Sequence, residues 1–180
     1  MRVIGVVGLP GSGKSEAANV AREAGVPVVT MGDVIRAACR ERGLDPATHH
    51  GEVAKALREE DGPAAIADRS LPHIREALED HDTVLVDGIR SDVEVETFAD
   101  AFGDAFTLVS VEAPFATRAE RITERGRDAD ESAGGEGLAE RDERELGFGM
   151  GEAMERADVT IENDGTLEAF RAEVRGLLDA

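Results

Sequence analysis

The sequence predicts an α/β domain in which a parallel sheet of about five strands is covered by helices on both faces. Short apolar runs alternate along the chain with longer stretches of helical periodicity, which is typical of strand–helix–strand units. A glycine-rich loop directly follows the first apolar run. The 180 residues can bury a substantial core, and no linker divides them, so we expect one domain over residues 1–180.

The expected elements follow in order along the chain. The strands are predicted at residues 3–7, 26–29, 83–86, 106–111 and 157–161. The helices are predicted at residues 15–23, 33–42, 52–60, 64–79, 92–102, 115–125, 138–155 and 166–178. In an open parallel sheet of this kind, ligands bind at the carboxyl ends of the strands, where the glycine-rich loop lies.

That loop reads Gly8-Leu9-Pro10-Gly11-Ser12-Gly13-Lys14-Ser15 and satisfies the phosphate-binding pattern G-x-x-x-x-G-K-[ST]. Its backbone N–H groups and the helix that starts near Gly13 can surround a polyphosphate. Lys14 is expected to reach the β- and γ-phosphates, and the Ser15 hydroxyl to hold Mg²⁺. The loop therefore predicts a P-loop NTPase three-layer sandwich that binds ATP and Mg²⁺ through Gly8, Pro10, Gly11, Ser12, Gly13, Lys14 and Ser15.

The composition is strongly acidic, with 39 Asp and Glu residues and a net charge of −19. The acids are spread along the whole chain, which favours a solvated surface suited to molar salt, as in a salt-in halophile. Nonspecific nucleic-acid binding needs a basic footprint and is not expected. The single cysteine, Cys39, the absence of a long apolar run and the immediate start of the first strand favour a cytoplasmic protein without a signal peptide.

The third expected strand ends in the run Thr83-Val84-Leu85-Val86-Asp87-Gly88. An acid at this position in P-loop proteins lies beside the loop and holds Mg²⁺, directly or through water, which makes Asp87 a metal and catalytic candidate. The alternative is that Asp87 only caps the following turn. Arg90 would project from the same edge and is a candidate for the acceptor site.

The segment Thr30-Met31-Gly32-Asp33-Val34-Ile35-Arg36 follows the second expected strand. It resembles the T-G-D-x-[IL]-R segment of adenylate-kinase-like nucleoside monophosphate kinases, with Met31 inserted between threonine and glycine. The resemblance implies that Asp33 and Arg36 belong to the acceptor site, with the arginine on the acceptor phosphate. The alternative is that Asp33 caps the following helix while Arg36 lies in solvent.

A third segment, Arg118 to Asp128, contains arginines at positions 118, 121, 125 and 127. It resembles the R-x-x-x-R-x-R segment that enters the lid of the same kinases, and the glycine-rich acidic stretch 126–137 would be that lid. The resemblance implies that Arg121 and Arg125 stabilise the transferring phosphoryl group, with Arg141 and Arg144 as further candidates. The alternative is that nearby acids pair with these arginines on a solvated helix.

Near the carboxyl end, Val159 to Leu167 resembles the last strand and turn of dephospho-CoA kinase and its relatives. The resemblance implies that the backbone around Asn163 contacts the donor adenine, although Asn-Asp-Gly is also an ordinary turn. The segments 57–63 and 67–69 resemble an archaeal group of nucleotide kinase-like proteins in this superfamily. They lie in the expected acceptor-binding insertion, about residues 32–80, where Arg58 and Arg69 are further candidates.

The adjacent residues His49 and His50 resemble a metal-binding pair, but adjacent side chains diverge on a helix and no cysteine partner is near. We expect a histidine pair in a loop. Together the segments predict an ATP-dependent phosphotransferase acting on a nucleoside monophosphate or a similar small phosphorylated metabolite. Two other functions are possible for the same residues: an ATPase switch or assembly factor, and a nucleotide-binding module without catalysis. The sequence names neither the acceptor nor the oligomeric state.

Overall fold

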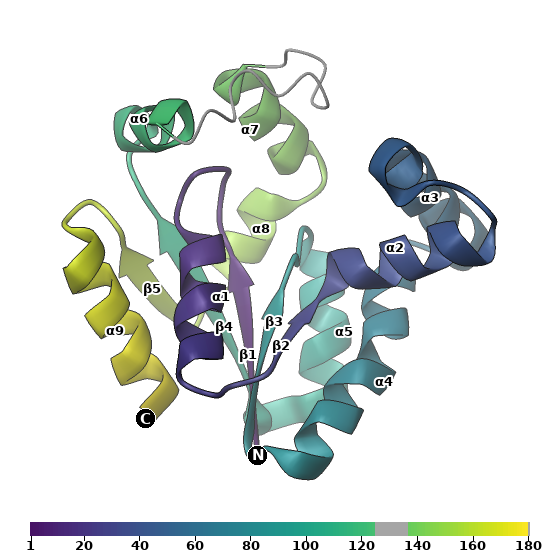
Figure 1. Cartoon of the computed structure of the whole chain (residues 1–180), viewed down its shortest axis with the longest axis horizontal. Coiled ribbons are helices and arrows are strands. Elements are labelled where there is room, and N and C mark those ends of the chain that lie inside the picture. The colour runs from purple at the N-terminus through teal and green to yellow at the C-terminus, as the bar shows by residue number, and fades with distance from the viewer. Residues whose placement is uncertain (125–136, 180) are drawn as a thin grey trace.

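The computed structural model describes residues 1–124 and 137–179, and within them it contains a five-stranded parallel sheet (Figure 1). The strands are β1 (Arg2–Val7), β2 (Val28–Thr30), β3 (Thr83–Asp87), β4 (Phe106–Glu112) and β5 (Val159–Glu162). Their order across the sheet is β2-β3-β1-β4-β5, and every pair is parallel. The predicted fold class is therefore confirmed.

Helices cover both faces of this sheet. They are α1 (Lys14–Glu23), α2 (Met31–Glu41), α3 (Pro46–Asp61), α4 (Ala65–Asp80), α5 (Asp92–Phe102), α6 (Phe115–Glu124), α7 (Leu138–Gly147), α8 (Met150–Glu155) and α9 (Leu167–Asp179), with the short 3₁₀ helix η1 (Gly103–Ala105) before β4. Three of them, α2, α3 and α4, form the connection between β2 and β3.

The core is divided by the sheet into two apolar clusters. Because successive side chains of a strand point to opposite faces, Ile4 and Val6 of β1 pack with α1 and α9, whereas Val3 and Val7 pack on the other face. That second cluster includes residues of α2, α3, α4, α5 and α8. In Figure 1 the two layers of helices lie on either side of the sheet, with α6 and α7 above its carboxyl edge.

The predicted single helix over residues 138–155 is wrong, because α7 ends at Gly147 and α8 begins at Met150. Between them, Gly149 has a φ of +99°, a conformation that side chains with a Cβ rarely adopt. A Cβ at this position would also lie 3.0 Å from the Asp92 carboxylate. The break turns the chain from α7, above the sheet edge, into α8, which packs against the core.

Helix α3 begins six residues earlier than the predicted 52–60 segment. Asp45 caps it, with its side chain accepting a hydrogen bond of 3.0 Å from the Ala47 N–H, and Pro46 occupies the first turn. His49 and His50 therefore lie on a helix, and the expectation that they belong to a loop is wrong.

Candidate active site

The phosphate-binding loop connects β1 to α1 at the carboxyl edge of the sheet. Three of its glycines have φ between +80° and +150°: Gly8, Gly11 and Gly13. A Cβ at Gly8 would overlap the Val111 carbonyl oxygen, and one at Gly13 would overlap the Asn163 amide. Both the backbone conformation and the packing therefore require glycine, and the loop is fixed against β4 and the turn after β5.

Lys14, the first residue of α1, lies along the inner side of the loop. Its Nζ donates hydrogen bonds to the carbonyl oxygens of Gly8 at 2.5 Å and Leu9 at 3.1 Å. Burial lowers the pKa of the Lys14 ammonium to about 8, although the carboxylates of Asp87 and Glu145 act in the opposite direction. A phosphate beside this ammonium would favour the charged form further.

The other loop residues face different ways. Pro10, Gly11, Lys14 and Ser15 line the main cavity. The Ser12 side chain is buried and instead lines a small cavity of about 110 Å³ behind the loop, beside Arg118. Among the described residues its hydroxyl has no hydrogen-bond partner.

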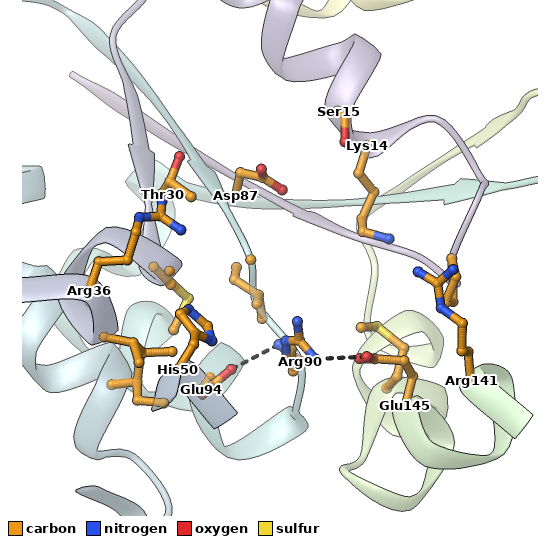
Figure 2. Close-up of a pocket in the computed structure, with 18 of the residues that line it drawn as sticks. Lys14, Ser15, Thr30, Arg36, His50, Asp87, Arg90, Glu94, Arg141 and Glu145 are labelled. Carbon is orange, nitrogen blue, oxygen red and sulfur yellow. Dashed lines mark hydrogen bonds and ion pairs between the residues drawn. The ribbon is translucent and has the colours of Figure 1, made fainter. Parts of the chain in front are cut away.

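Ser15, in the first turn of α1, and Asp87, at the end of β3, line the same cavity (Figure 2). Asp87 is the last residue of β3, and the strand register places it beside Val6 of β1 and Thr30 of β2. A hydroxyl and a carboxylate are oxygen ligands of the kind that Mg²⁺ binds together with phosphate oxygens and water. No cluster of three or more His, Cys, Asp or Glu side chains able to hold a metal occurs within residues 1–124 and 137–179. These two residues thus fit a Mg²⁺ ion carried by a nucleotide.

The cavity has a volume of about 360 Å³ and continues from the loop to the helical connection between β2 and β3. Its floor is aliphatic, formed by Met31, Ile35, Ile66, Ile89 and Met150. Its polar walls, beyond the loop and Asp87, are Thr30, Arg36, His50, Arg58, Arg90, Glu94, Arg141 and Glu145 (Figure 2). The space can therefore take an anionic group and an apolar body.

Arg90 lies between two buried carboxylates. Its Nη1 donates to Glu145 Oε1 at 2.7 Å, and its backbone N–H donates to Glu94 Oε2 at 2.8 Å. The Arg58 guanidinium is 3.5 Å from the other oxygen of Glu94. Burial raises the pKa of Glu94, against the effect of the Arg90 N–H and Arg58.

Asp33 and Arg36 lie one turn apart on α2, but only Arg36 faces the cavity. Arg36 lines the cavity, whereas the Asp33 side chain is 69% exposed and accepts hydrogen bonds of 2.6 and 2.9 Å from Arg36. Asp33 is therefore placed to orient the arginine. His50 lines the cavity beside Arg36 (Figure 2), where burial and the Arg36 guanidinium lower its pKa.

The arginines of α6 pack against the loop. Arg118 is buried, donates to the Pro10 carbonyl oxygen at 3.1 Å and pairs with Asp142 of α7. Arg121 donates to the Asn163 carbonyl oxygen at 2.9 Å and to its side-chain oxygen at 3.2 Å. Arg125 and all of the expected lid, 126–137, except Gly137 lie outside the described residues.

Asn163 joins the turn after β5 to the loop, because its side-chain amide donates to the Ser12 carbonyl oxygen at 2.7 Å. Together with Gly13, Arg121 and Leu167 it lines a second pocket of about 230 Å³ on the other side of α1's amino end. The phosphate-binding loop thus separates the cavity that Lys14 lines from this second pocket.

Comparisons with known proteins identify the family of the chain. A family model described as an AAA domain, AAA_17, matches residues 7–134, which include the loop, Asp87 and α6. A UPF0200 protein of Halobacterium salinarum is 63% identical over 180 residues, covering 100% of this chain and 94% of that protein. The chain belongs to the AAA_17 and UPF0200 families.

Further UPF0200 relatives come from other archaea. The UPF0200 protein of Methanosarcina mazei is 48% identical over 179 residues, covering 99% of this chain and 94% of that protein. A UPF0200/UPF0201 protein of Archaeoglobus fulgidus is 51% identical over 179 residues, and the match spans 55% of that longer protein. The expected resemblance to an archaeal P-loop group is confirmed.

Solved structures share the fold of this UPF0200 chain. TT1252 from Thermus thermophilus superposes with a TM-score of 0.65 at 23% identity, covering 99% of this chain and 96% of that one. Shikimate kinase from Bacteroides thetaiotaomicron superposes with a TM-score of 0.61 at 16% identity, covering 99% of each chain. The likeness establishes a P-loop kinase-like fold.

Sequence reasoning missed three polar residues of this cavity. His50 was assigned to a loop, although the Asp45-Pro46 helix start would have placed it on α3. Glu94 and Glu145 lie in helices with many other acids, and nothing in the sequence separates them from exposed ones. Of the two further insertion candidates, Arg58 lines the cavity, whereas Arg69 pairs with Asp61 on the surface.

Proposed function

We propose that this protein is an ATP-dependent phosphotransferase that acts on a nucleoside monophosphate or a similar small phosphorylated metabolite. The supporting observation is one continuous cavity with Lys14 and Ser15 on one side and Arg36 and Arg90 on the other. A donor triphosphate on the loop and an anionic acceptor on the arginines would share this space. Positioning and charge neutralisation can supply most of the rate of phosphoryl transfer.

In this proposal each part of the chain has a distinct task. The loop N–H groups and Lys14 bind the β- and γ-phosphates, and Arg36 and Arg90 orient the acceptor. Ser15 and Asp87 would hold Mg²⁺, which would neutralise charge that develops on the phosphates during transfer. The aliphatic floor excludes water from the acceptor side, which favours transfer over hydrolysis.

The pocket lined by Gly13, Arg121, Asn163 and Leu167 is the proposed site of the donor base. It lies across the loop from the main cavity, so a nucleotide whose phosphates follow the loop would place its base here. The Arg121 guanidinium can stack on an aromatic ring, and the backbone of the turn offers hydrogen-bonding groups.

The test is formation of ADP from ATP·Mg²⁺ in multimolar KCl, with and without AMP, GMP, CMP, UMP, dTMP or dephospho-CoA. We expect ADP formation that depends on one acceptor and is abolished in Lys14→Ala. Lys55→Ala is the matched control, because Lys55 is the only other lysine and its side chain is 78% exposed. Full turnover in Lys14→Ala would contradict the proposal.

A second function, an ATPase switch or assembly factor, is favoured by one observation. The Archaeoglobus relative is nearly twice as long as this chain, and its name joins UPF0200 with UPF0201. A UPF0201 protein is therefore a proposed partner of this chain. This function predicts ATP hydrolysis without any acceptor and a stable complex with the UPF0201 protein, measured by co-purification with and without ATP·Mg²⁺.

A further inference from the structure

We propose that Glu145 is an internal anion that pairs with Arg90 on the acceptor side of the cavity and must be displaced by the acceptor. The acceptor subsite at Arg90 therefore accepts a phosphate monoester dianion and excludes chloride and ligands with a single carboxylate. The inference deepens the proposed function and rests on it. Its observation is the ion pair of 2.7 Å between Glu145 Oε1 and Arg90 Nη1 inside the cavity (Figure 2).

The Glu145 side chain is only 9% exposed, whereas that of Arg90 is 44% exposed. Only Nη1 of the Arg90 guanidinium donates a hydrogen bond to a side chain within the described part of the chain. A phosphate can accept two parallel hydrogen bonds from a guanidinium, so it offers Arg90 more than the single bond that Glu145 provides.

Glu145 is held in this position by the cations that would bind phosphate. Its charge raises the pKa of Lys14, which burial lowers, so the carboxylate acts on Lys14 as well as on Arg90. A buried carboxylate without such cations would be costly. Arg141 lies one turn earlier on α7 and also lines the cavity, so a cation on the same helix face is available to a displaced Glu145.

Anchoring of α7 does not require Glu145. Asp142, three residues earlier, makes two hydrogen bonds of 2.8 Å to the buried Arg118. That pair already connects α7 to α6 and, through Arg118, to the Pro10 carbonyl oxygen. The Glu145–Arg90 pair is therefore an additional contact, directed into the cavity.

The consequence for ligands follows from mass action. An internal competitor raises the apparent dissociation constant of every anion by the same factor. A free carboxylate or chloride ion carries one charge, as Glu145 does, and lacks the high local concentration of an intramolecular group, so its binding falls below the measurable range. A dianion with two-point contacts still binds. The acidic composition predicts that the protein functions in molar salt, where chloride would bind to the Arg90 guanidinium if Glu145 did not occupy it.

The test uses inorganic phosphate and acetate as probes, titrated by calorimetry without ATP. Wild type should bind phosphate but not acetate, with little dependence on chloride. Glu145→Gln should bind phosphate about tenfold more tightly or better, should bind acetate, and should become sensitive to chloride. Glu143→Gln removes the same charge from an exposed position of α7 and should behave as wild type.

Two further variants locate the anion. In the Lys14→Ala background, which removes the cation of the donor loop, Arg90→Ala should lose the remaining phosphate binding, and the gain from Glu145→Gln should vanish when Arg90→Ala is added. Phosphate binding should persist in Lys14→Ala, because the donor loop is a separate subsite. Loss in Lys14→Ala with retention in Arg90→Ala would overturn the inference, as would unchanged or weaker binding in a folded Glu145→Gln.

If Glu145→Gln does not fold, the phosphate and acetate titrations of the wild-type protein test the inference. Acetate binding to wild type as tight as that of phosphate would overturn the inference, and selective phosphate binding that requires Arg90 would support it. The proposed function is judged separately, because these titrations contain no ATP and the turnover assay contains no phosphate or acetate probe.

Discussion

Arg118 of α6 and Asp142 of α7 form a two-point ion pair, with both N–O distances at 2.8 Å and side chains only 6% and 13% exposed. The same guanidinium donates to the Pro10 carbonyl oxygen of the phosphate-binding loop and to the Ala113 carbonyl oxygen after β4. One buried arginine thus connects the loop, the end of β4 and the helix that carries Glu145.

Asp142→Asn should lower the free energy of unfolding by about 3 kcal/mol, because it leaves the Arg118 charge buried without its anion. ATP affinity should fall as well, since the loop loses a support. The measurement is denaturant unfolding in KCl. Glu96→Gln breaks the exposed Arg156–Glu96 pair and should cost less than about 1 kcal/mol. Equal costs for the two variants would contradict the role given to the buried pair.

The affinity for ATP should depend on pH through Lys14. Because burial lowers the pKa of this ammonium to about 8, it is charged below that pH and neutral above it. ATP affinity should therefore be level below pH 8 and fall by up to about tenfold per pH unit above it. Lys14→Arg stays charged and should lose this dependence. A level profile for wild type through pH 9 would refute the assignment.

Asp87→Asn should weaken Mg²⁺ binding far more than it destabilises the fold. Loss of the carboxylate removes a hard oxygen ligand, so we expect the Mg²⁺ concentration for half-maximal turnover to rise by about tenfold or more. Asp82→Asn is the control, because Asp82 directly precedes the first residue of β3, at the end of the strand away from the cavity. Mg²⁺ titrations of both variants at fixed ATP compare them, and identical curves would argue that Asp87 only caps the turn after β3.

Gly13→Ala should disrupt the contact between the loop and the turn after β5. The φ of Gly13 is +124°, and a Cβ there would overlap the Asn163 amide that donates to Ser12. Gly25 also has a positive φ, +78°, but nothing lies within 4 Å of a Cβ there. Gly25→Ala should cost about 1–2 kcal/mol from backbone strain alone. We expect Gly13→Ala to be less stable and to bind ATP poorly; equal stability and normal ATP binding would contradict this.

The order of the elements could be predicted from local patterns. Each strand of the sheet is a short apolar run, and the loop motif fixes where β1 ends and α1 begins. Boundaries were less certain where a cap or a single glycine decides them, as at Asp45 before α3 and Gly149 after α7. Asp45 and Gly149 can both be read in the sequence, but the predicted helix boundaries followed the helical periodicity of the neighbouring residues instead.

The acceptor side of the cavity could be predicted only in part. Arg36 lies in the helix that follows β2 and Arg90 in the loop that follows β3, so their place near the carboxyl edge follows from the topology. Glu145 contacts Arg90 across 55 residues of sequence, and Glu94 contacts Arg58 of α3 across 36 residues. Such contacts depend on how helices pack, which no local pattern of charges specifies.

The measurement that tests the central claim most directly is the fate of the γ-phosphate of labelled ATP in multimolar KCl, with the acceptor panel present. The account predicts that the label appears on one phosphorylated acceptor, in wild type and in Lys55→Ala but not in Lys14→Ala. Label found only in inorganic phosphate, at a rate that no acceptor changes, would contradict it and favour an ATPase switch.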